Sequence, residues 1–483
     1  MSRSALGVAL VALLVSPLLA SAQGGHEFRE FNCANLAPAA MSRPDLWRAL
    51  NLGMARYDVS WGAIQPERGK WEFAEYDARL LQIVEQGVPV LGMLGYTAEW
   101  AATQEPYSFE YHGRDPSGRR VDQRWQVTFR DRGQPLKLPF LFKVNLDTGS
   151  RSEPYGISLG NLPPARTADW LRYVDRVVGR YSKPPWSIKY WQIWNEFNWP
   201  DWYHQDWHDF IDRMHIPAAK VIRKHGCKVV FGGWACTQGA AELNELLAYQ
   251  DAWKYTDIVD FHYLTNPAFQ ETYDAWVKSG KCYGIWTTET GWTLWPGYLP
   301  NCYARLFYWA LTHKWERPDQ YKAFWFHFTS VPVQPGLTHF GDGPMRPSAI
   351  GDRLRVLANL LPGKVRPFAD FECNPALPFD LTEEHASAEG FLTEHAIVIA
   401  LHFPEGMLAD TPKVTVHVNA LPGRLIRAER CTETGDDTPI EAMPENGALK
   451  VIVPTEGLQA DVWRFEAKGV TVYVKVQFVA QSL

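Results

Sequence analysis

The chain has 483 residues, more than one hydrophobic core usually fills, so we expect two domains. Its formal net charge is −6 with both signs mixed along the chain, which excludes the basic stripe that a nucleic-acid-binding protein needs. The 7 cysteines include no Cys-x-x-Cys pair, so the sequence predicts neither a zinc centre nor a redox centre.

Residues 1–22 are typical of a secretory signal peptide. Arg3 supplies a positive start, residues 5–19 are almost wholly apolar, and Ala20-Ser21-Ala22 offers small residues for cleavage. No later apolar run is long enough to span a membrane, so we predict no membrane span and a secreted or periplasmic protein. Such a location permits disulfides, and Cys373 with Cys431 is one candidate pair.

From residue 23 to residue 365, short apolar strands alternate with amphipathic helices. This pattern predicts a (β/α)₈ barrel, because several strands are continuous apolar runs of the kind buried on both faces. The expected helices include one that begins at Thr167 and others at 77–84, 210–225, 303–313 and 349–361. The expected strands are Glu27–Phe31, Met54–Val59, Val88–Leu94, Ile188–Trp194, Val229–Gly233, Ile258–His262, Tyr283–Thr288 and Ala323–Phe328.

A long insertion at 97–166 follows the third expected strand. It leaves the barrel at the face where active sites of such barrels lie, so we expect it to form an ordered lid or subdomain over the site. Between Gly113 and Lys143 it carries eight arginine and lysine residues against three aspartates. A hairpin exposed to solvent explains these charges. The alternative is that they form a wall of the site that faces an anionic sugar.

The pattern changes after Gly363, and we place a second domain at 366–483. Val414, Val416 and Val418 alternate with polar residues, which is the period of a strand with one wet face. Further strands are expected at 449–453, 462–466 and 470–478, separated by glycine and proline turns. Together they predict an antiparallel β-sandwich.

Two glutamates each follow an apolar barrel strand, which places them at the mouth of the barrel. Glu196 ends the fourth strand and Glu289 ends the seventh, and tryptophans flank both. Hydrolysis of a glycosidic bond needs two carboxyl groups, one that protonates the leaving oxygen and one that attacks in the retaining route. We therefore predict a retaining glycoside hydrolase whose two catalytic carboxyl groups are those of Glu196 and Glu289.

The barrel sequence resembles clan A glycoside hydrolases, and within them family 39 and its polysaccharide-cleaving relatives. The resemblance covers roughly residues 27–360. It implies the same fold and cleavage of β-glycosidic bonds in an oligo- or polysaccharide, with Glu196 as general acid/base and Glu289 as nucleophile. The residues that carry it are the runs Arg56-Tyr57-Asp58-Val59-Ser60-Trp61, Leu94-Gly95-Tyr96, Trp194-Asn195-Glu196, Asp257 to Tyr263, and Thr288-Glu289-Thr290-Gly291, together with Trp325.

Other residues at the strand ends are candidates for substrate binding. Asn195 is expected to bond the sugar 2-hydroxyl, and Arg56 to hold Glu289 ionised or simply to form a structural ion pair. His262 either touches sugar, braces the acid or is a satisfied core histidine. Tyr263 is expected to donate to the nucleophile, although relatives often separate the histidine and the tyrosine by one residue. The remaining candidates are aromatic: Tyr96, Trp199, Trp292 and Trp325.

Two alternative functions remain open from the sequence. One is a carbohydrate-binding protein that is catalytically weak, which would keep the aromatic residues without the chemistry. The other is a transglycosylase, which shares the glycosyl-enzyme and passes it to a sugar instead of water. The partner in each case is a carbohydrate, and no metal or organic cofactor is implied because two carboxyl groups suffice. The oligomeric state is not predicted.

Overall fold

The computed structural model describes most of residues 24–480. The segments outside the description are 104–106, 115–119, 128–158, 199–201, 204, 236–239, 264–265, 292–296, 330–335, 340–343, 382–384, 446–447 and 465–466. The expected signal peptide also lies outside it. Within the described residues, no helix combines the length and apolar character needed to cross a bilayer.

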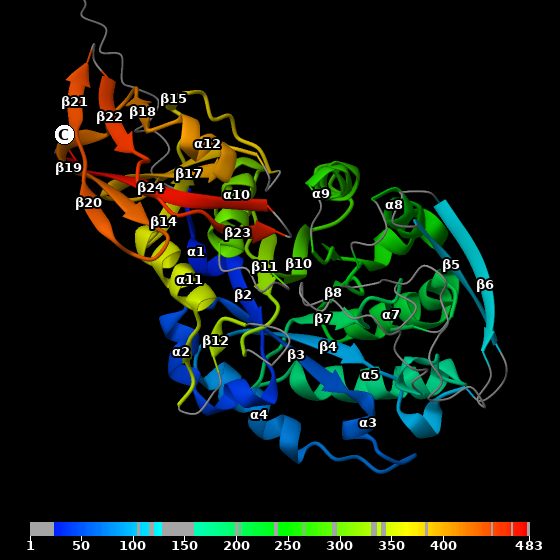
Figure 1. Ribbon diagram of the computed structural model, residues 1–483. Helices are drawn as coiled ribbons and strands as arrows, with labels where there is room; N and C mark the ends of the chain where they lie inside the picture. Colours follow the sequence, from blue (N-terminus) through cyan, green and yellow to red (C-terminus); the bar gives the residue numbers. More distant parts are fainter. Residues whose placement is uncertain are drawn as a thin grey trace, which may run out of the picture.

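Eight parallel strands close into the expected barrel (Figure 1). Each strand pairs with its neighbours in the order β10-β11-β2-β3-β4-β7-β8-β9, so the first strand, β2, closes the barrel against the last, β11. The barrel strands are β2 (Asn32–Asn35), β3 (Met54–Ser60), β4 (Val90–Gly95), β7 (Tyr190–Ile193), β8 (Lys228–Val230), β9 (Ile258–Asp260), β10 (Gly284–Thr290) and β11 (Tyr321–Trp325).

The first expected strand, at Glu27–Phe31, is wrong. Phe28 and Phe31 lie three residues apart, and both bury against Phe307 from a single helical turn, α1 (Phe28–Phe31). The barrel strand is the next segment, β2. The two residues before the turn form β1 (His26–Glu27), which pairs antiparallel with β14 (Lys364–Pro367) of the C-terminal sheet.

Side chains inside the barrel change from apolar to polar along the strands. One cluster that includes Cys33, Met54 and Phe324 fills the interior at the level where the strands begin. Side chains of a strand alternate between its two faces, so residues two positions further on point inward at the next level. That level is polar and holds Asn35, Arg56, Gln192, Asp260 and Thr288, all buried. The apolar level supports a polar floor beneath the mouth.

Helices surround the barrel, and the longest match the predicted amphipathic segments. They pack their apolar faces on the outward side of the strands, in one large core. The helices are α2 (Pro44–Ala49), α3 (Trp61–Ile64), α4 (Ala74–Glu85), α5 (Thr167–Tyr181), α6 (Trp207–Asp209), α7 (Ile216–Lys224), α8 (Ala240–Ala248), α9 (Asn266–Thr272), α10 (Tyr298–Thr312) and α11 (Ala349–Leu360), with α12 (Glu405–Asp410) in the C-terminal domain.

Part of the insertion at 97–166 forms an antiparallel hairpin of β5 (Tyr107–Arg114) and β6 (Arg120–Val127). Figure 1 draws it on the side of the barrel away from the C-terminal domain. The rest of the insertion between residues 128 and 158, with several of its basic residues, falls outside the described residues. Its role as a lid therefore stays a prediction.

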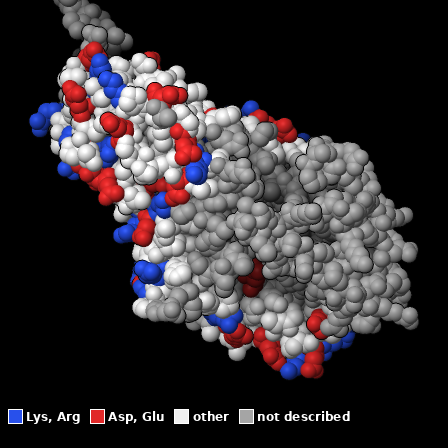
Figure 2. All heavy atoms as spheres, viewed as in Figure 1, with Lys and Arg blue, Asp and Glu red and all other residues white. Residues whose placement is uncertain are grey.

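The C-terminal part is the predicted β-sandwich. Its inner faces meet in a second core of alternating apolar residues, such as Val414, Val416 and Val418. Figure 2 shows basic and acidic side chains interspersed over this domain. One sheet has the order β1-β14-β16-β17-β24-β19-β20 with β23 at its edge, and the other has the order β15-β18-β22-β21. The strands are β15 (Phe371–Asn374), β16 (Ser387–Leu392), β17 (Ala396–Pro404), β18 (Lys413–Val418), β19 (Gly423–Thr432), β20 (Asp437–Pro439), β21 (Ala442–Glu445), β22 (Ala448–Pro454), β23 (Asp461–Arg464) and β24 (Ala467–Ala480).

The central strand β17 is buried on both faces. Ile397 and Ile399 point into the sandwich, whereas Val398 and Ala400 belong to the barrel core. Arg353 of α11 adds an ion pair across the same interface, to Glu433 at 2.9 Å and to Asp461 at 2.7 Å. The sandwich therefore completes the outer layer of the barrel.

The candidate disulfide between Cys373 and Cys431 is not formed, and both thiols are free. Cys431 lies in the barrel core, whereas Cys373 packs at the edge of the sandwich core. They stand on strands of different sheets and on opposite sides of the larger one, which explains why they do not pair.

Candidate active site

Glu289 lies inside strand β10, buried at the mouth of the barrel, and is 5% exposed. Donors reach both of its carboxylate oxygens. Arg56 Nη1 donates to Oε1 at 2.8 Å, and the Tyr263 hydroxyl donates to Oε2 at 2.9 Å. Burial raises the pKa of Glu289, and His262, Arg56 and the Tyr263 hydrogen bond oppose that rise. These donors hold the carboxylate in one orientation.

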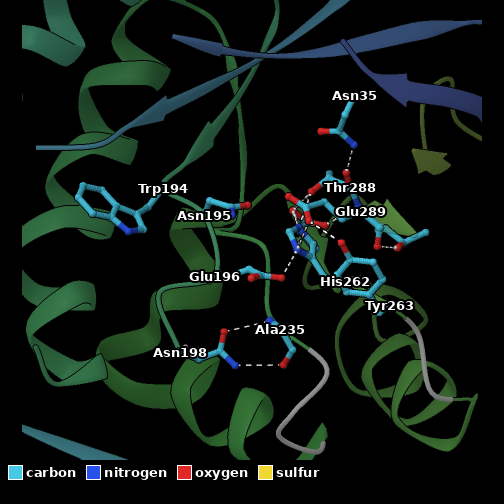
Figure 3. Close-up of polar contacts among 12 residues, drawn as sticks. Asn35, Trp194, Asn195, Glu196, Asn198, Ala235, His262, Tyr263, Thr288 and Glu289 are labelled. Atoms are coloured by element: carbon cyan, nitrogen blue, oxygen red, sulfur yellow. Dashed lines mark hydrogen bonds and ion pairs between the residues drawn. The ribbon is translucent and has the colours of Figure 1, made fainter. Parts of the chain in front are cut away.

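Glu196 follows strand β7 at a sharp turn of the backbone. Trp194 and Glu196 both have positive φ, at 69° and 46°, and the Glu196 N–H donates to the Gly233 carbonyl at 3.1 Å. This turn directs Trp194 away from the site and Glu196 into it (Figure 3). Asn198 fixes the following loop through two hydrogen bonds with the backbone of Ala235.

The two carboxyl groups face the same space. Oxygen atoms of Glu196 and Glu289 lie within 4.8 Å of one another, with His262 between the side chains (Figure 3). Burial raises the pKa of Glu196 to about 7, although Arg56 and a hydrogen bond with Trp202 lower it. Glu196 is thus a carboxyl group that can carry a proton near neutral pH.

Arg56 joins the residues on the barrel floor. Besides Glu289, its guanidinium donates to Gln192 at 2.8 Å, to Asn35 at 2.6 Å and to Asn195 at 2.5 Å. The contact with Asn195 uses the amide oxygen, so the amide nitrogen of this side chain faces elsewhere. Arg56 therefore orients both the nucleophile candidate and the asparagine beside the acid candidate.

His262 and Tyr263 reach the two glutamates separately. His262 Nδ1 lies 2.9 Å from Glu196 Oε1 and 3.6 Å from Glu289 Oε2, and the ring is 0% exposed. Of the three roles left open by the sequence, this geometry matches the one in which the histidine braces the acid. Tyr263 reaches Glu289 despite being adjacent to His262, because its φ of 47° turns its side chain back toward β10.

Glu196, His262 and Glu289 also form the one group of described residues whose ligand atoms converge as in a metal site. The surroundings oppose a cation. Both oxygens of Glu289 already accept hydrogen bonds, and one of them comes from a guanidinium. A metal ion there would face the buried positive charge of Arg56. The arrangement favours carboxyl groups that serve proton transfer and attack.

The mouth of the site contains an aromatic pair and a further carboxylate. Tyr96, after strand β4, stacks on Trp202 with ring centroids 5.8 Å apart. Asp58 of β3 lies two residues beyond Arg56, so it points inward one level closer to the opening. It is exposed, and no described residue pairs with it. Nothing in the sequence distinguishes Asp58 from a surface carboxylate on a strand.

Trp325 does not present a stacking face. The side chain is 0% exposed and packs outside the barrel against Tyr298 and Tyr303 of α10. Because strand side chains alternate, the next residue, Phe326, lies on the inward side and is only half-buried. The prediction was wrong by one residue. Trp199 and Trp292 lie outside the described residues, so their roles stay predictions.

No protein-family model and no curated protein sequence matches the chain. Solved structures share its fold. A GH39 enzyme from Xanthomonas axonopodis pv. citri superposes with a TM-score of 0.56 at 12% identity, covering 95% of this chain and 96% of that one. A monomeric β-xylosidase from Caulobacter crescentus CB15 gives 0.53 at 13% identity, covering 95% and 98%. A GH30 endoxylanase from Clostridium papyrosolvens C71 gives 0.53 at 12%, covering 94% and 97%.

The similarity extends over both domains, because nearly the whole of each chain is covered. At these identities it establishes the fold, and the predicted resemblance to family 39 is confirmed at that level. The chemistry rests on the site itself.

Proposed function

We propose that the protein is a retaining glycoside hydrolase that cleaves β-glycosidic bonds in an oligo- or polysaccharide. The observation that carries this proposal is a pair of carboxyl groups, that of Glu289 buried and that of Glu196 partly buried, whose oxygens lie within 4.8 Å of one another. Retaining glycosidases hold their two carboxyl groups about 5–5.5 Å apart, whereas inverting ones leave room for a water molecule between them.

The surroundings of the two groups assign their roles. Glu289 receives donors on both oxygens, which favours the ionised form and aims it as a nucleophile at the anomeric carbon. The pKa of Glu196 near 7 suits a group that protonates the leaving oxygen and later deprotonates water. Asn195, whose oxygen is held by Arg56, has its amide nitrogen available to donate to the sugar 2-hydroxyl.

Aromatic residues at the mouth are the proposed sugar contacts. Tyr96 and Trp202 form one wall, and Phe326 takes the stacking role first expected of Trp325. Two of the similar solved structures are described as xylan- or xyloside-cleaving enzymes, and we take xylosides and xylan as the first substrates to try. We also propose, from the N-terminal sequence, that the enzyme acts outside the cytoplasm.

The roles of the two glutamates are tested with Glu289→Gln and Glu196→Gln on a dinitrophenyl glycoside. Glu289→Gln should form no glycosyl-enzyme, because no other group is placed to attack. Glu196→Gln should still form it, since this leaving group departs unprotonated, and should then stall because water lacks a base. Azide needs no base, so it should rescue Glu196→Gln and give a glycosyl azide of retained configuration.

The configuration of the azide decides the assignment. An inverted glycosyl azide from Glu196→Gln would mean that the two roles are exchanged. A wild-type protein that binds sugars but cleaves none of a broad glycoside panel would favour the binding-protein alternative, and transfer of the glycosyl group to sugar in preference to water would favour the transglycosylase.

A further inference from the structure

A chain of hydrogen bonds runs beneath His262, on the side away from the glutamates. His262 Nε2 lies 2.8 Å from the Thr288 hydroxyl, and that hydroxyl lies 2.6 Å from Asp260 Oδ2. Asp260 Oδ1 accepts the Thr288 backbone N–H at 2.9 Å. All three side chains are 0% exposed, so no water competes for these contacts. The chain ends at Glu196, through His262 Nδ1.

The hydrogens in this chain can be counted. The Thr288 hydroxyl has one hydrogen, and two acceptors compete for it: the Asp260 carboxylate at 2.6 Å and Gln192 Oε1 at 3.3 Å. The carboxylate is closer, and a charged acceptor forms the stronger bond. Gln192 Oε1 already accepts from Arg56. The hydroxyl hydrogen therefore lies on the Asp260 side, and the Thr288 oxygen is left to accept from His262 Nε2–H.

A neutral His262 with its hydrogen on Nε2 has a bare Nδ1. Glu196 Oε1 lies 2.9 Å from that nitrogen, a distance at which two acceptors repel unless one of them carries a hydrogen. The hydrogen must then belong to the Glu196 carboxyl group. We propose that Asp260, acting through Thr288, is a positioning residue that fixes the tautomer of His262 and thereby keeps the acid proton on Glu196. This inference rests on the proposed function.

The charged groups around these hydrogen bonds favour the same placement of the protons. Burial raises the pKa of Asp260 to about 6, opposed by His262, Thr288 and Arg56, whereas the pKa of Glu196 is about 7. Burial lowers the pKa of His262, and Glu289, Asp260 and Arg56 are the charged groups that act on the ring. These shifts favour an ionised Asp260, a neutral His262 and a protonated Glu196.

Asp260→Asn should reverse the direction of the hydrogen bonds between residue 260 and Glu196 while leaving the side chains in place. The Thr288 backbone N–H needs an acceptor, so the amide oxygen must face it and the amide NH₂ must face the Thr288 hydroxyl. The hydroxyl would then donate to His262 Nε2, and the hydrogen of the imidazole would move to Nδ1. An Nδ1–H donates to Glu196 and stabilises its carboxylate, so the pKa of Glu196 should fall by about one unit.

The tautomer is measured directly by NMR of the full chain labelled with ¹⁵N-histidine, with His262→Gln used to assign the signal. At a pH between the values for Asp260 and Glu196, the wild type should show the Nε2–H form and Asp260→Asn the Nδ1–H form. The same tautomer in both proteins would overturn the inference. This readout needs no activity, so it decides the inference even if the protein hydrolyses no glycoside and the proposed function fails.

Kinetics supply the second readout, on a substrate with an alkyl leaving group that requires the acid. The alkaline limb of the kcat/KM profile should move down by about one pH unit in Asp260→Asn, which is a loss of about tenfold on that limb. The profile for a dinitrophenyl leaving group, which departs without the acid, should be the same in both proteins. If Asp260 had only a structural role, Asp260→Asn would lower kcat/KM for both substrates alike at every pH. That result would overturn the proposal.

Two further variants keep the test independent of the folding of Asp260→Asn. Thr288→Val removes the bridging hydroxyl and should shift the His262 tautomer, whereas Thr288→Ser should keep the wild-type tautomer and profile. A profile that Thr288→Val leaves unchanged would contradict the proposal. Glu433→Gln, another buried carboxyl that lies at the domain interface, is the matched control and should leave the alkaline limb in place.

Discussion

Glu196 and Glu289 have the same functional group, and their neighbours make them different acids. Arg56 and Tyr263 donate to the buried Glu289, whereas the partly buried Glu196 contacts the His262 ring and Trp202. Asn35, Gln192 and Thr288 add no charge, yet they fix Arg56 and His262, and through them both glutamates. The division of labour therefore depends on residues that do not touch the sugar.

The pH dependence of activity follows from these contacts. The free enzyme needs Glu196 protonated, so kcat/KM should fall as the pH rises through about 7, the pKa of that group. It also needs Glu289 ionised, so kcat/KM should fall again on the acid side, at a pH above the ordinary glutamate value because burial raises the pKa. A pH profile on an unactivated glycoside measures both limbs. A dinitrophenyl glycoside does not need the acid, so the same alkaline limb on that substrate would assign it to another group.

Asp58 leads to a prediction about the charge of the sugar. An unpaired carboxylate at the mouth repels a carboxylate on the substrate, and repulsion between two like charges in a cleft is worth on the order of 1 kcal/mol or more. Asp58→Asn should therefore raise kcat/KM for a uronide relative to the matching neutral glycoside, by about tenfold. Added salt should reduce the difference between wild type and variant. An equal change for both substrates would show that Asp58 binds hydroxyl groups and does not select charge.

At the scale of the elements, the strands of the barrel were predictable because each buries both faces and so reads as an apolar run. Seven of the eight lie where expected, and the first was misplaced because Phe28 and Phe31 satisfy a helical turn as well as a strand. Trp325 was misassigned for a related reason. A strand reverses its faces at every residue, and the sequence does not reveal which of Trp325 and Phe326 points inward.

The catalytic pair was also predictable, because a glutamate that ends an apolar strand has few structural uses. The roles of Asp260 and Thr288 were not. Both read as ordinary polar residues near strand ends, and the sequence does not show that their side chains meet between the adjacent strands β9 and β10. The sequence does not reveal Asp58 as a site residue either, because its exposure depends on the open mouth of the barrel above it.

The end of strand β10 supplies a prediction at this scale. Gly291 has a φ of +83°, and a Cβ atom there would lie 2.3 Å from the ring of Trp325. Gly291→Ala must therefore move the tryptophan or the strand end that carries Glu289. We expect kcat to fall at least tenfold with the fold intact, since a displacement of about 1 Å in a catalytic group can have a larger effect. Circular dichroism and kinetics on one sample test this, and unchanged kcat would show that the ring yields instead. Gly69→Ala, also at positive φ but with open space around it, is the control.

At the scale of the whole molecule, the two domains meet in an interface that is buried like a hydrophobic core. Strand β17 contributes to both cores, and Arg353 places its guanidinium against Glu433, whose side chain is 6% exposed. We therefore expect barrel and sandwich to unfold in a single calorimetric transition. Two transitions would contradict this and would show that the shared strand does not couple the domains.

Arg353→Met tests the ion pair within that interface. It leaves Glu433 buried without its partner, a change that typically costs about 3–5 kcal/mol, so the midpoint of thermal unfolding should fall. The double variant Arg353→Met/Glu433→Gln should recover part of the loss, because no charge is then left buried. Equal midpoints for the single and double variants would mean that the lost packing of Arg353 dominates.

The pairing of β1 with β14 sets an order of events during synthesis. Residues 26 and 27 are made first, but their partners at 364 and 365 follow the whole barrel sequence. A growing chain therefore carries an N-terminal end with no strand to join until the ribosome has nearly finished the barrel. Strand β2 follows one helical turn later and pairs with β11 to close the barrel. This pairing also forms late, because β11 is the last barrel strand to be synthesised.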